Sequence, residues 1–143
     1  MKIIRTGSAV WSGGLKDGRG ALSTQSGALK DYPYGFASRF EGVPGSNPEE
    51  LLGAAHAGCF TMALSLILGE AGLAAERMET TARVALEQVD GGFAITSVQL
   101  TLRARIPGAD EAQFRELADK AKANCPVSKL FNTEITLDAA LEG

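Results

Sequence analysis

The sequence predicts an α+β fold in which short strands, a long helix, a hairpin, a second helix and a final strand follow one another. Three observations support this fold class. Residues 1–40 are short stretches interrupted by glycines, residues 48–70 are almost continuously apolar after a helix-start signal, and residues 78–106 carry apolar side chains at every second position. Because strands and helices do not alternate strictly, the pattern favours the α+β class. A chain of 143 residues has the length of one domain, which we expect to comprise residues 1–143.

The first 40 residues are expected to form three short strands. Met1–Trp11 is a candidate strand and Arg19–Ser23 a second, with a glycine-rich loop at residues 12–20 between them. Tyr34–Glu41, which follows Pro33, is expected to be the third.

The long helix has the clearest start signal in the chain. Asn47 is a good N-cap, Pro48 suits the first helical position, and Glu50 is placed to complete a capping box. The helix is expected to run to about Glu70, with Gly72 as its stop.

The body of this helix is apolar on nearly every face, and a helix of that kind is expected to be buried all round. The longest apolar segment of the chain, Gly53–Leu68, carries three polar side chains and is expected to be too short to span a membrane. One sheet and one further helix in a chain of this size give such a helix too little cover. The pattern therefore predicts a dimer in which the long helix packs against its own copy.

The C-terminal half is expected to contain a hairpin, a helix and a last strand. Apolar and polar residues alternate through residues 78–106 on either side of the turn at residues 90–92, which predicts a β-hairpin with one buried face. Asp110 then starts an amphipathic helix, and the Cys-Pro pair at residues 125–126 interrupts it. After a short helical turn, Glu134–Leu141 is expected to form the final strand.

The composition is that of an ordinary soluble globular protein, with 45% hydrophobic and 22% charged residues. It excludes a disordered chain, a collagen-like repeat and a disulfide-dense scaffold. The 14 basic and 17 acidic residues give a net charge of −3, and the basic residues are scattered. Neither a nucleic acid nor a membrane is therefore an expected partner. No signal peptide is visible, and the cytoplasm is the expected location.

The two cysteines, Cys59 and Cys125, are the most informative residues, and in a reducing compartment they are expected to be thiols. Cys59 lies in the middle of the long helix. It is either a small core residue or a thiol that ionises only beside a cation brought from elsewhere. Cys125 precedes Pro126 and is expected at the start of a short helix, whose dipole favours a thiolate. The alternative is that Cys125 merely fills space in a loop.

Three further side chains are candidates, each with a structural alternative. Arg39 is either a solvated residue on the outer face of a strand or a buried cation that needs a carboxylate. Glu49 is first of all an acid at a helix N-terminus. His56, the only histidine, is either a core residue with satisfied hydrogen bonds or the partner of Cys59 in a Cys–His dyad. The ligand spacing is poor for a metal and no phosphate-binding fingerprint is present, so we expect neither a metal nor a cofactor.

The chain resembles the OsmC family, the osmotically inducible relatives of the organic hydroperoxide resistance proteins. The resemblance begins with the segment PYGFASRFEGVPGSNPEELLGAAHAGCFTMALSLILGEAG and continues through GFAIT, KAKANCPVS and EITLD, so it covers essentially the whole chain. The two cysteines are also as far apart as the family pattern requires. Arg39 stands in RFEG just before the long helix, which is the arrangement of the OsmC branch.

The resemblance implies a cysteine-based peroxidase that acts on organic hydroperoxides and less well on hydrogen peroxide. Cys59 would be the peroxidatic cysteine and Cys125 the resolving one, joined by an intramolecular disulfide after each reaction. Arg39 and Glu49 would be the supporting pair. The implied fold is an intertwined homodimer with an antiparallel sheet wrapped around two long, buried helices, which fits the helix that lacked cover.

The same resemblance implies the partners of the reaction. An organic hydroperoxide would be the substrate, and a small or protein dithiol would reset the enzyme. An apolar pocket lined by residues such as Phe36, Phe60 and Met62 would favour alkyl peroxides.

Helix geometry adds an expectation about the dimer. Glu49 and Cys59 are ten residues apart on one helix, which separates them by about 15 Å along its axis. Glu49 therefore serves a site at Cys59 most simply from an antiparallel partner helix. The crossing would then be centred at Ala54, where small residues allow a close approach. We expect active sites shared across a two-fold interface.

Two rival functions remain open. One is a non-catalytic, stress-induced dimer that binds a hydrophobic small molecule and uses both cysteines only for packing. The other is a redox sensor that uses the same thiol chemistry to signal through a partner.

Overall fold

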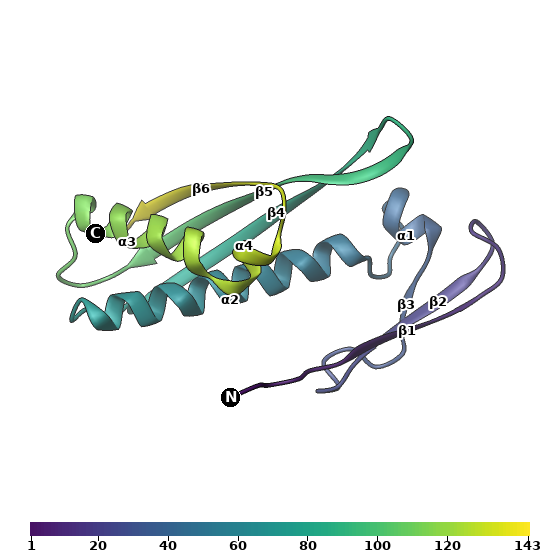
Figure 1. The fold of residues 1–143 in the computed structure, drawn as a ribbon, viewed down its shortest axis with the longest axis horizontal. Coiled ribbons are helices and arrows are strands. Elements are labelled where there is room, and N and C mark those ends of the chain that lie inside the picture. The colour runs from purple at the N-terminus through teal and green to yellow at the C-terminus, as the bar shows by residue number, and fades with distance from the viewer. The chain divides into compact units, whose positions relative to one another are not determined.

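Two compact units, residues 1–51 and residues 52–143, make up the computed structural model, which describes residues 1–143 (Figure 1). The first unit contains a three-stranded antiparallel sheet of β1 (Gly7–Ser12), β2 (Arg19–Thr24) and β3 (Tyr32–Tyr34), in that order. The first two predicted strands are confirmed, except that residues 1–6 lie outside β1.

The third predicted strand is wrong beyond Tyr34, because helix α1 (Phe36–Phe40) follows β3. Local contacts explain the turn to helix. The backbone N–H of Gly35 donates to Ser38 Oγ at 2.9 Å. The rings of Phe36 and Phe40, four residues apart, pack with their centroids 5.0 Å apart. Arg39 therefore lies on a short helix and not on a strand.

Helix α2 (Pro48–Glu70) has the bounds expected from the sequence. Asn47 Oδ1 accepts from the backbone N–H of Glu50 at 2.8 Å, which confirms the N-cap. The capping box is different from the prediction, because the Glu50 carboxylate accepts from the side chains of Ser46 and Asn47. At the other end Gly72 has a φ of +76°, and the N–H of Leu73 donates to the carbonyl of Leu68, as in a Schellman motif.

The second sheet has the strand order β4-β5-β6 and is mixed. β4 (Arg77–Val89) and β5 (Gly92–Arg105) form the predicted antiparallel hairpin, and β6 (Glu134–Leu141) pairs with β5 in parallel. Helices α3 (Glu111–Asn124) and α4 (Pro126–Leu130) form the crossover that returns the chain to the start of the sheet. The prediction of one antiparallel sheet is therefore wrong, because the α+β chain forms two sheets and the second has a parallel pair.

One hydrophobic core holds the second unit together, and α2 and α3 cover the same face of its sheet (Figure 1). Alternate residues of β5 point into this core, which accounts for the period of two in the sequence. The largest buried side chains come from α2, β5 and α3: Phe60, Leu64, Leu68, Leu100, Leu102 and Phe114.

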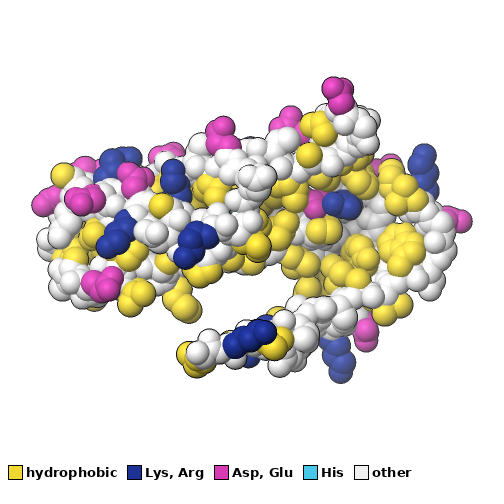
Figure 2. Space-filling model, viewed as in Figure 1, with side chains coloured by type: hydrophobic (Ala, Val, Ile, Leu, Met, Phe, Trp, Pro, Cys, Tyr) yellow, Lys and Arg dark blue, Asp and Glu magenta, His cyan; other side chains and the backbone are white.

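Within the single chain α2 is buried on one face only, which agrees with the expectation that one copy of the chain gives this helix too little cover. Its buried positions recur at helical spacing on one face, whereas Met62 and Leu66 on another face are 77% and 67% exposed. Figure 2 shows hydrophobic side chains at the surface of this unit. The sequence pattern demanded more cover for α2 than one copy of the chain provides.

By length and composition alone, α2 would be able to cross a membrane, with 23 residues and a mean hydropathy of 1.8 in its most apolar window. The expectation that this segment is too short is wrong by that criterion. The same length and composition are found in core helices of soluble proteins, and one face of α2 does lie in the core.

Candidate functional site

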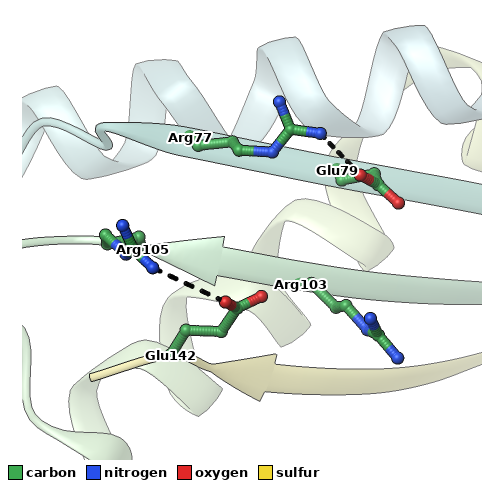
Figure 3. Close-up of a pocket in the computed structure, with 5 residues that line it drawn as sticks. All are labelled: Arg77, Glu79, Arg103, Arg105 and Glu142. Carbon is green, nitrogen blue, oxygen red and sulfur yellow. Dashed lines mark hydrogen bonds and ion pairs between the residues drawn. The ribbon is translucent and has the colours of Figure 1, made fainter.

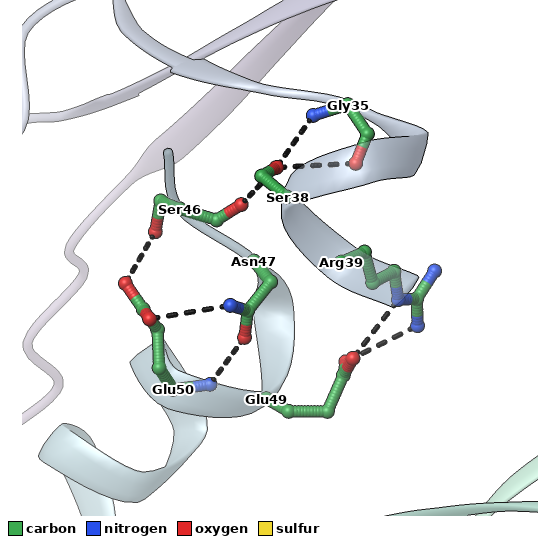
Figure 4. A network of polar contacts seen from close by, with 7 residues as sticks. All are labelled: Gly35, Ser38, Arg39, Ser46, Asn47, Glu49 and Glu50. Carbon is green, nitrogen blue, oxygen red and sulfur yellow. Dashed lines mark hydrogen bonds and ion pairs between the residues drawn. The ribbon is translucent and has the colours of Figure 1, made fainter. Parts of the chain in front are cut away.

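The first group of candidate residues is an ion pair in the unit of residues 1–51. Arg39 of α1 donates from Nε to Glu49 Oε1 at 2.9 Å and from Nη2 to Glu49 Oε2 at 3.1 Å (Figure 4). The Glu49 side chain is 9% exposed, whereas the Arg39 side chain is 36% exposed. The two bonds use two of the five N–H donors of the guanidinium and fix its plane, which leaves three donors for another group. Arg39 is paired with a carboxylate, as one alternative required, but its side chain remains exposed, as the other alternative expected.

A polar network holds the ion pair in place. Ser38 of α1 donates from Oγ to the carbonyl of Ser46 at 2.8 Å, and Ser46 Oγ donates to Glu50 Oε2 at 3.0 Å (Figure 4). These bonds tie α1 to the first turn of α2, so that Arg39 reaches Glu49 from a defined direction.

An apolar pocket of about 200 Å³ lies beside Arg39 in the same unit. Phe36 is one of its lining residues, as the sequence analysis anticipated for an apolar pocket. The other aromatic and aliphatic side chains around it are Trp11, Leu15, Tyr34 and Phe40. A guanidinium at the wall of an apolar pocket is suited to a small molecule with one polar end.

The second group is the pair of thiols in the unit of residues 52–143. Cys59 is half-buried on α2, and Cys125 is completely buried between α3 and α4. Both are free thiols, and the Cys59 sulfur is within hydrogen-bonding reach of the Cys125 side chain and of the backbone N–H of Val127. The fold thus brings together two thiols that are 66 positions apart in the sequence.

On balance, the surroundings of Cys59 in this unit raise the pKa of its thiol. Burial raises the pKa of the Cys59 thiol; the hydrogen bond from the Val127 N–H lowers that pKa, and the hydrogen bond and charge of Cys125 raise it further. These surroundings favour the neutral thiol. The sequence argument that a thiol in mid-helix needs a cation from elsewhere therefore agrees with the structure.

Cys125 is the N-cap of α4, as predicted from the Cys-Pro pair. Its sulfur accepts from the backbone N–H of Ser128 at 3.3 Å. The first turn of α4 thus provides one N–H to each sulfur, from Val127 to Cys59 and from Ser128 to Cys125.

Sequence reasoning missed Ser128. Its hydroxyl lies 3.1 Å from the Cys125 sulfur and 2.7 Å from Nε2 of His56, which is completely buried. His56 is thus a core histidine, but only half satisfied, because Nδ1 has no hydrogen-bond partner. Burial lowers the pKa of His56. The available signal was the spacing, because a serine three residues after a helix N-cap meets the capping side chain.

The three residues expected to line one pocket are separated. Phe60 is completely enclosed in the core, so its assignment to an open substrate pocket is wrong. Met62 lies two positions further, on a different face of the helix, and lines an open groove of about 550 Å³ with residues of α2 and β4. Phe36 lines the pocket beside Arg39.

A further pocket of about 240 Å³ is polar and lies on the opposite face of the second sheet from the core. It is lined by exposed side chains of alternating charge (Figure 3): Arg77, Glu79, Arg103, Arg105 and Glu142. Its ion pairs, Arg77–Glu79 at 2.7 Å and Arg105–Glu142 at 3.9 Å, join half-exposed or more exposed groups. Exposed pairs of this kind are typical of a solvated sheet face.

No group of three or more His, Cys, Asp or Glu side chains converges on a point that would hold a metal ion.

Comparison with known proteins identifies the family. The family model described as OsmC-like protein matches residues 41–140. The chain is 54% identical over 142 residues to peroxiredoxin OsmC of Escherichia coli (strain K12), with 99% of each chain covered. It is 32% identical to an organic hydroperoxide resistance protein of Xanthomonas axonopodis pv. citri, with 97% of this chain and 96% of the relative covered. The crystal structure of an organic hydroperoxide resistance protein from Elizabethkingia anophelis matches with a TM-score of 0.72 and 29% identity, covering 99% of this chain and 100% of that one. The sequence, the fold and these matches agree that the chain belongs to the OsmC family.

Proposed function

We propose that this protein is a thiol-dependent peroxidase that reduces organic hydroperoxides, and more weakly hydrogen peroxide, to alcohols and water. The observation that carries the proposal is the proximity of the free thiols of Cys59 and Cys125. Its relatives support it, because they are named peroxiredoxin and organic hydroperoxide resistance protein.

The reaction uses the two sulfurs in sequence. The Cys59 thiolate attacks the distal oxygen of the hydroperoxide, the O–O bond breaks, and the alkoxide takes a proton and leaves as the alcohol. Cys59 is then a sulfenic acid. The Cys125 sulfur attacks the Cys59 sulfur, the S–O bond breaks, and water leaves as the disulfide forms. An external dithiol reduces this disulfide by exchange and is itself oxidised.

Arg39 is the cation that this chemistry requires. Because burial favours the neutral thiol at Cys59, the attack needs a positive charge that stabilises the thiolate and the developing alkoxide. The Arg39 guanidinium has three N–H donors left for that purpose, and Glu49 holds it in one orientation.

The Arg39–Glu49 pair reaches Cys59 from a second copy of the chain. Glu49 and Cys59 are ten residues apart on α2, or about 15 Å along its axis. Since Arg39 is bonded to Glu49 of its own chain, the two side chains enter the site together, as Arg39 and Glu49 of the partner subunit. The exposed apolar face of α2 supports a homodimer, because a second α2 would cover it. In this proposal residues 1–143 act as one functional domain.

The substrate class follows from the pocket beside Arg39. Its aromatic lining, including Phe36, suits the alkyl or aryl part of an organic hydroperoxide, while the guanidinium suits the peroxide end. The reducing cytoplasm is the compartment that would keep both thiols reduced and supply a dithiol.

The direct test is the consumption of cumene hydroperoxide in excess dithiothreitol by the wild type, Cys59→Ser and Cys125→Ser. We expect repeated turnover in the wild type, none in Cys59→Ser, and reduced turnover in Cys125→Ser. A wild type that consumes only one equivalent would indicate a redox sensor. A wild type that consumes none would indicate a binding protein.

The role of Arg39 is tested with a matched pair of variants. Arg39→Gln is expected to reduce the rate of the first turnover by at least roughly 10²-fold, because one charge that stabilises the transition state is lost. Arg77→Gln, which removes an arginine from an exposed ion pair on the opposite sheet face, is expected to leave the rate unchanged. Equal rates in both variants would exclude Arg39 from the site.

The dimer is tested on the exposed face of α2. Met62→Asp is expected to convert the protein to a monomer in sedimentation velocity and to abolish turnover, because the carboxylate would be buried in the interface. Val89→Asp at the end of β4 is the control for an exposed apolar residue outside that face. A monomeric wild type with full activity would contradict the shared site.

A further inference from the structure

His56 is a buried titratable residue that the reaction described above does not use. It is completely buried on α2, one turn before Cys59, and its ring packs edge-on against Phe131 with the centroids 5.2 Å apart. Its Nδ1 has no hydrogen-bond partner. A buried, half-satisfied imidazole destabilises a fold relative to an apolar side chain of the same size, so its only polar contact is informative.

That contact begins a chain of polar atoms that ends at the resolving sulfur. His56 Nε2 lies 2.7 Å from Ser128 Oγ, and Ser128 Oγ lies 3.1 Å from Cys125 Sγ. Ser128 is buried, and His56 and Cys125 are completely buried. The Cys125 sulfur in turn is within hydrogen-bonding reach of the Cys59 sulfur. The chain therefore joins a buried base to the two atoms that form the disulfide.

The hydroxyl of Ser128 has only one proton, which makes the chain directional. With a neutral thiol, Cys125 donates to Ser128 Oγ and Ser128 donates to His56 Nε2. With a Cys125 thiolate, the Ser128 hydroxyl donates to the sulfur and a protonated Nε2 donates to Ser128 Oγ. The same positions of the sulfur, oxygen and nitrogen atoms serve both arrangements, and the backbone N–H of Ser128 donates to the sulfur as well, at 3.3 Å.

We propose that His56 accepts the proton of the Cys125 thiol through Ser128 when Cys125 resolves the sulfenic acid. This inference rests on the proposed peroxidase function. Ser128 touches the reacting sulfur, whereas His56 acts through Ser128 and is a positioning residue.

The proton and electron balance is complete. The Cys125 thiol proton passes to Ser128 Oγ while the Ser128 proton passes to His56 Nε2. The electron pair left on the Cys125 sulfur forms the S–S bond with Cys59, and the pair of the S–O bond leaves with the oxygen as hydroxide. The hydroxide takes up a proton from solvent and becomes water, and His56 releases its proton to solvent. The net reaction therefore moves one proton from the Cys125 thiol to the hydroxide, and no further oxidant or reductant is needed.

The environment of His56 suits this role. Burial lowers the pKa of its imidazole, so Nε2 is unprotonated and able to accept a proton near neutral pH. The thiol of Cys125 is the titratable group at the far end of its hydrogen-bond chain.

The test separates the two half-reactions in a single turnover. Reduced wild type, His56→Gln, Ser128→Ala and Ser128→Thr are mixed with one equivalent of cumene hydroperoxide, and hydroperoxide loss, sulfenic acid and disulfide are followed. A 1,3-diketone probe traps the sulfenic acid. Gln places an oxygen near the position of Nε2 that can accept from Ser128 but is not basic, and Thr keeps the hydroxyl.

We expect hydroperoxide loss in all four proteins at the same rate within about two-fold. Disulfide formation should slow roughly 10²-fold in His56→Gln and Ser128→Ala, with trapped sulfenic acid increasing in proportion. Ser128→Thr should restore disulfide formation to near the wild-type rate. An unchanged rate of disulfide formation in His56→Gln, or in Ser128→Ala, would overturn the inference.

A second oxidant keeps this inference distinguishable from the peroxidase function. Diamide forms the Cys59–Cys125 disulfide without a hydroperoxide, and its second step also requires the Cys125 sulfur to lose a proton. If the wild type consumed no hydroperoxide, the proposed function would fail, and slower diamide-driven disulfide formation in His56→Gln would still support the proton path. Equal diamide rates in the two proteins would refute it.

Discussion

Burial of His56 makes the stability of this fold sensitive to mild acid. Burial lowers the pKa of His56 in the folded chain below its ordinary value of 6.5. Below pH 6.5 the unfolded chain therefore binds a proton at this histidine that the folded chain does not bind. The contribution of neutral His56 to the free energy of unfolding is fully present above pH 6.5. It is lost as the pH falls towards the pKa of His56 in the folded chain.

The size of the effect follows from proton linkage. His56 is the only histidine of the chain, so no other imidazole contributes. At pH 5.5 protonation stabilises the unfolded chain by up to about 1.4 kcal/mol, because the proton is then bound about ten times out of eleven. The variant His56→Gln has no such proton to bind. Between pH 7.5 and 5.5 the free energy of unfolding of the wild type should thus fall by up to about 1.4 kcal/mol more than that of the variant.

The measurement is urea unfolding followed by far-ultraviolet circular dichroism, at one protein concentration and with reductant present. Both proteins are compared at four pH values from 7.5 to 5.0. Because they have the same carboxylates, the effect of carboxylate protonation cancels in the difference between their free energies of unfolding. The expected result is a difference in the free energy of unfolding that grows as the pH falls below 6.5. Parallel curves over this range would show that His56 is freely protonated in the folded state and would refute the reasoning from burial.

Three further predictions concern the two units separately. In a double-mutant cycle of Arg39→Met and Glu49→Gln, urea unfolding should give a coupling free energy of about 1 to 2 kcal/mol, reduced by the partial exposure of Arg39; additive effects would contradict the bidentate pair. Leu64→Ala should reduce the free energy of unfolding by about 2 to 5 kcal/mol, because the side chain is completely buried, and a loss below 1 kcal/mol would contradict its place in the core. Gly20→Ala should change the near-ultraviolet circular dichroism spectrum of the first unit, because the added Cβ would collide with the ring of Tyr34. An unchanged spectrum would contradict this packing.

The local elements could be predicted from the sequence because their signals are short-range. Asn47 is the N-cap that the sequence predicts, and Asp110, predicted as the start of a helix, also accepts from the backbone N–H three residues later. The hairpin followed from a period of two and a glycine turn, and its residues face the core as expected. The residues themselves made the two cysteines candidates for chemistry, the family resemblance implied their roles, and the structure brings the two thiols close together.

Only the tertiary structure decided how distant residues meet. The parallel pairing of β6 with β5 depends on the path through α3 and α4, and the placement of α1 against the start of α2 depends on the bonds from Ser38 to Ser46 and from Arg39 to Glu49. The spacing of Ser128 from the N-cap indicated a contact with Cys125, but only the fold places its hydroxyl between Cys125 and the buried His56. The sequence determined most of the helices and strands, since those depend on neighbours along the chain. Packing determined which side chains lie within hydrogen-bonding distance of one another, since such contacts depend on distances of a few ångströms across the core.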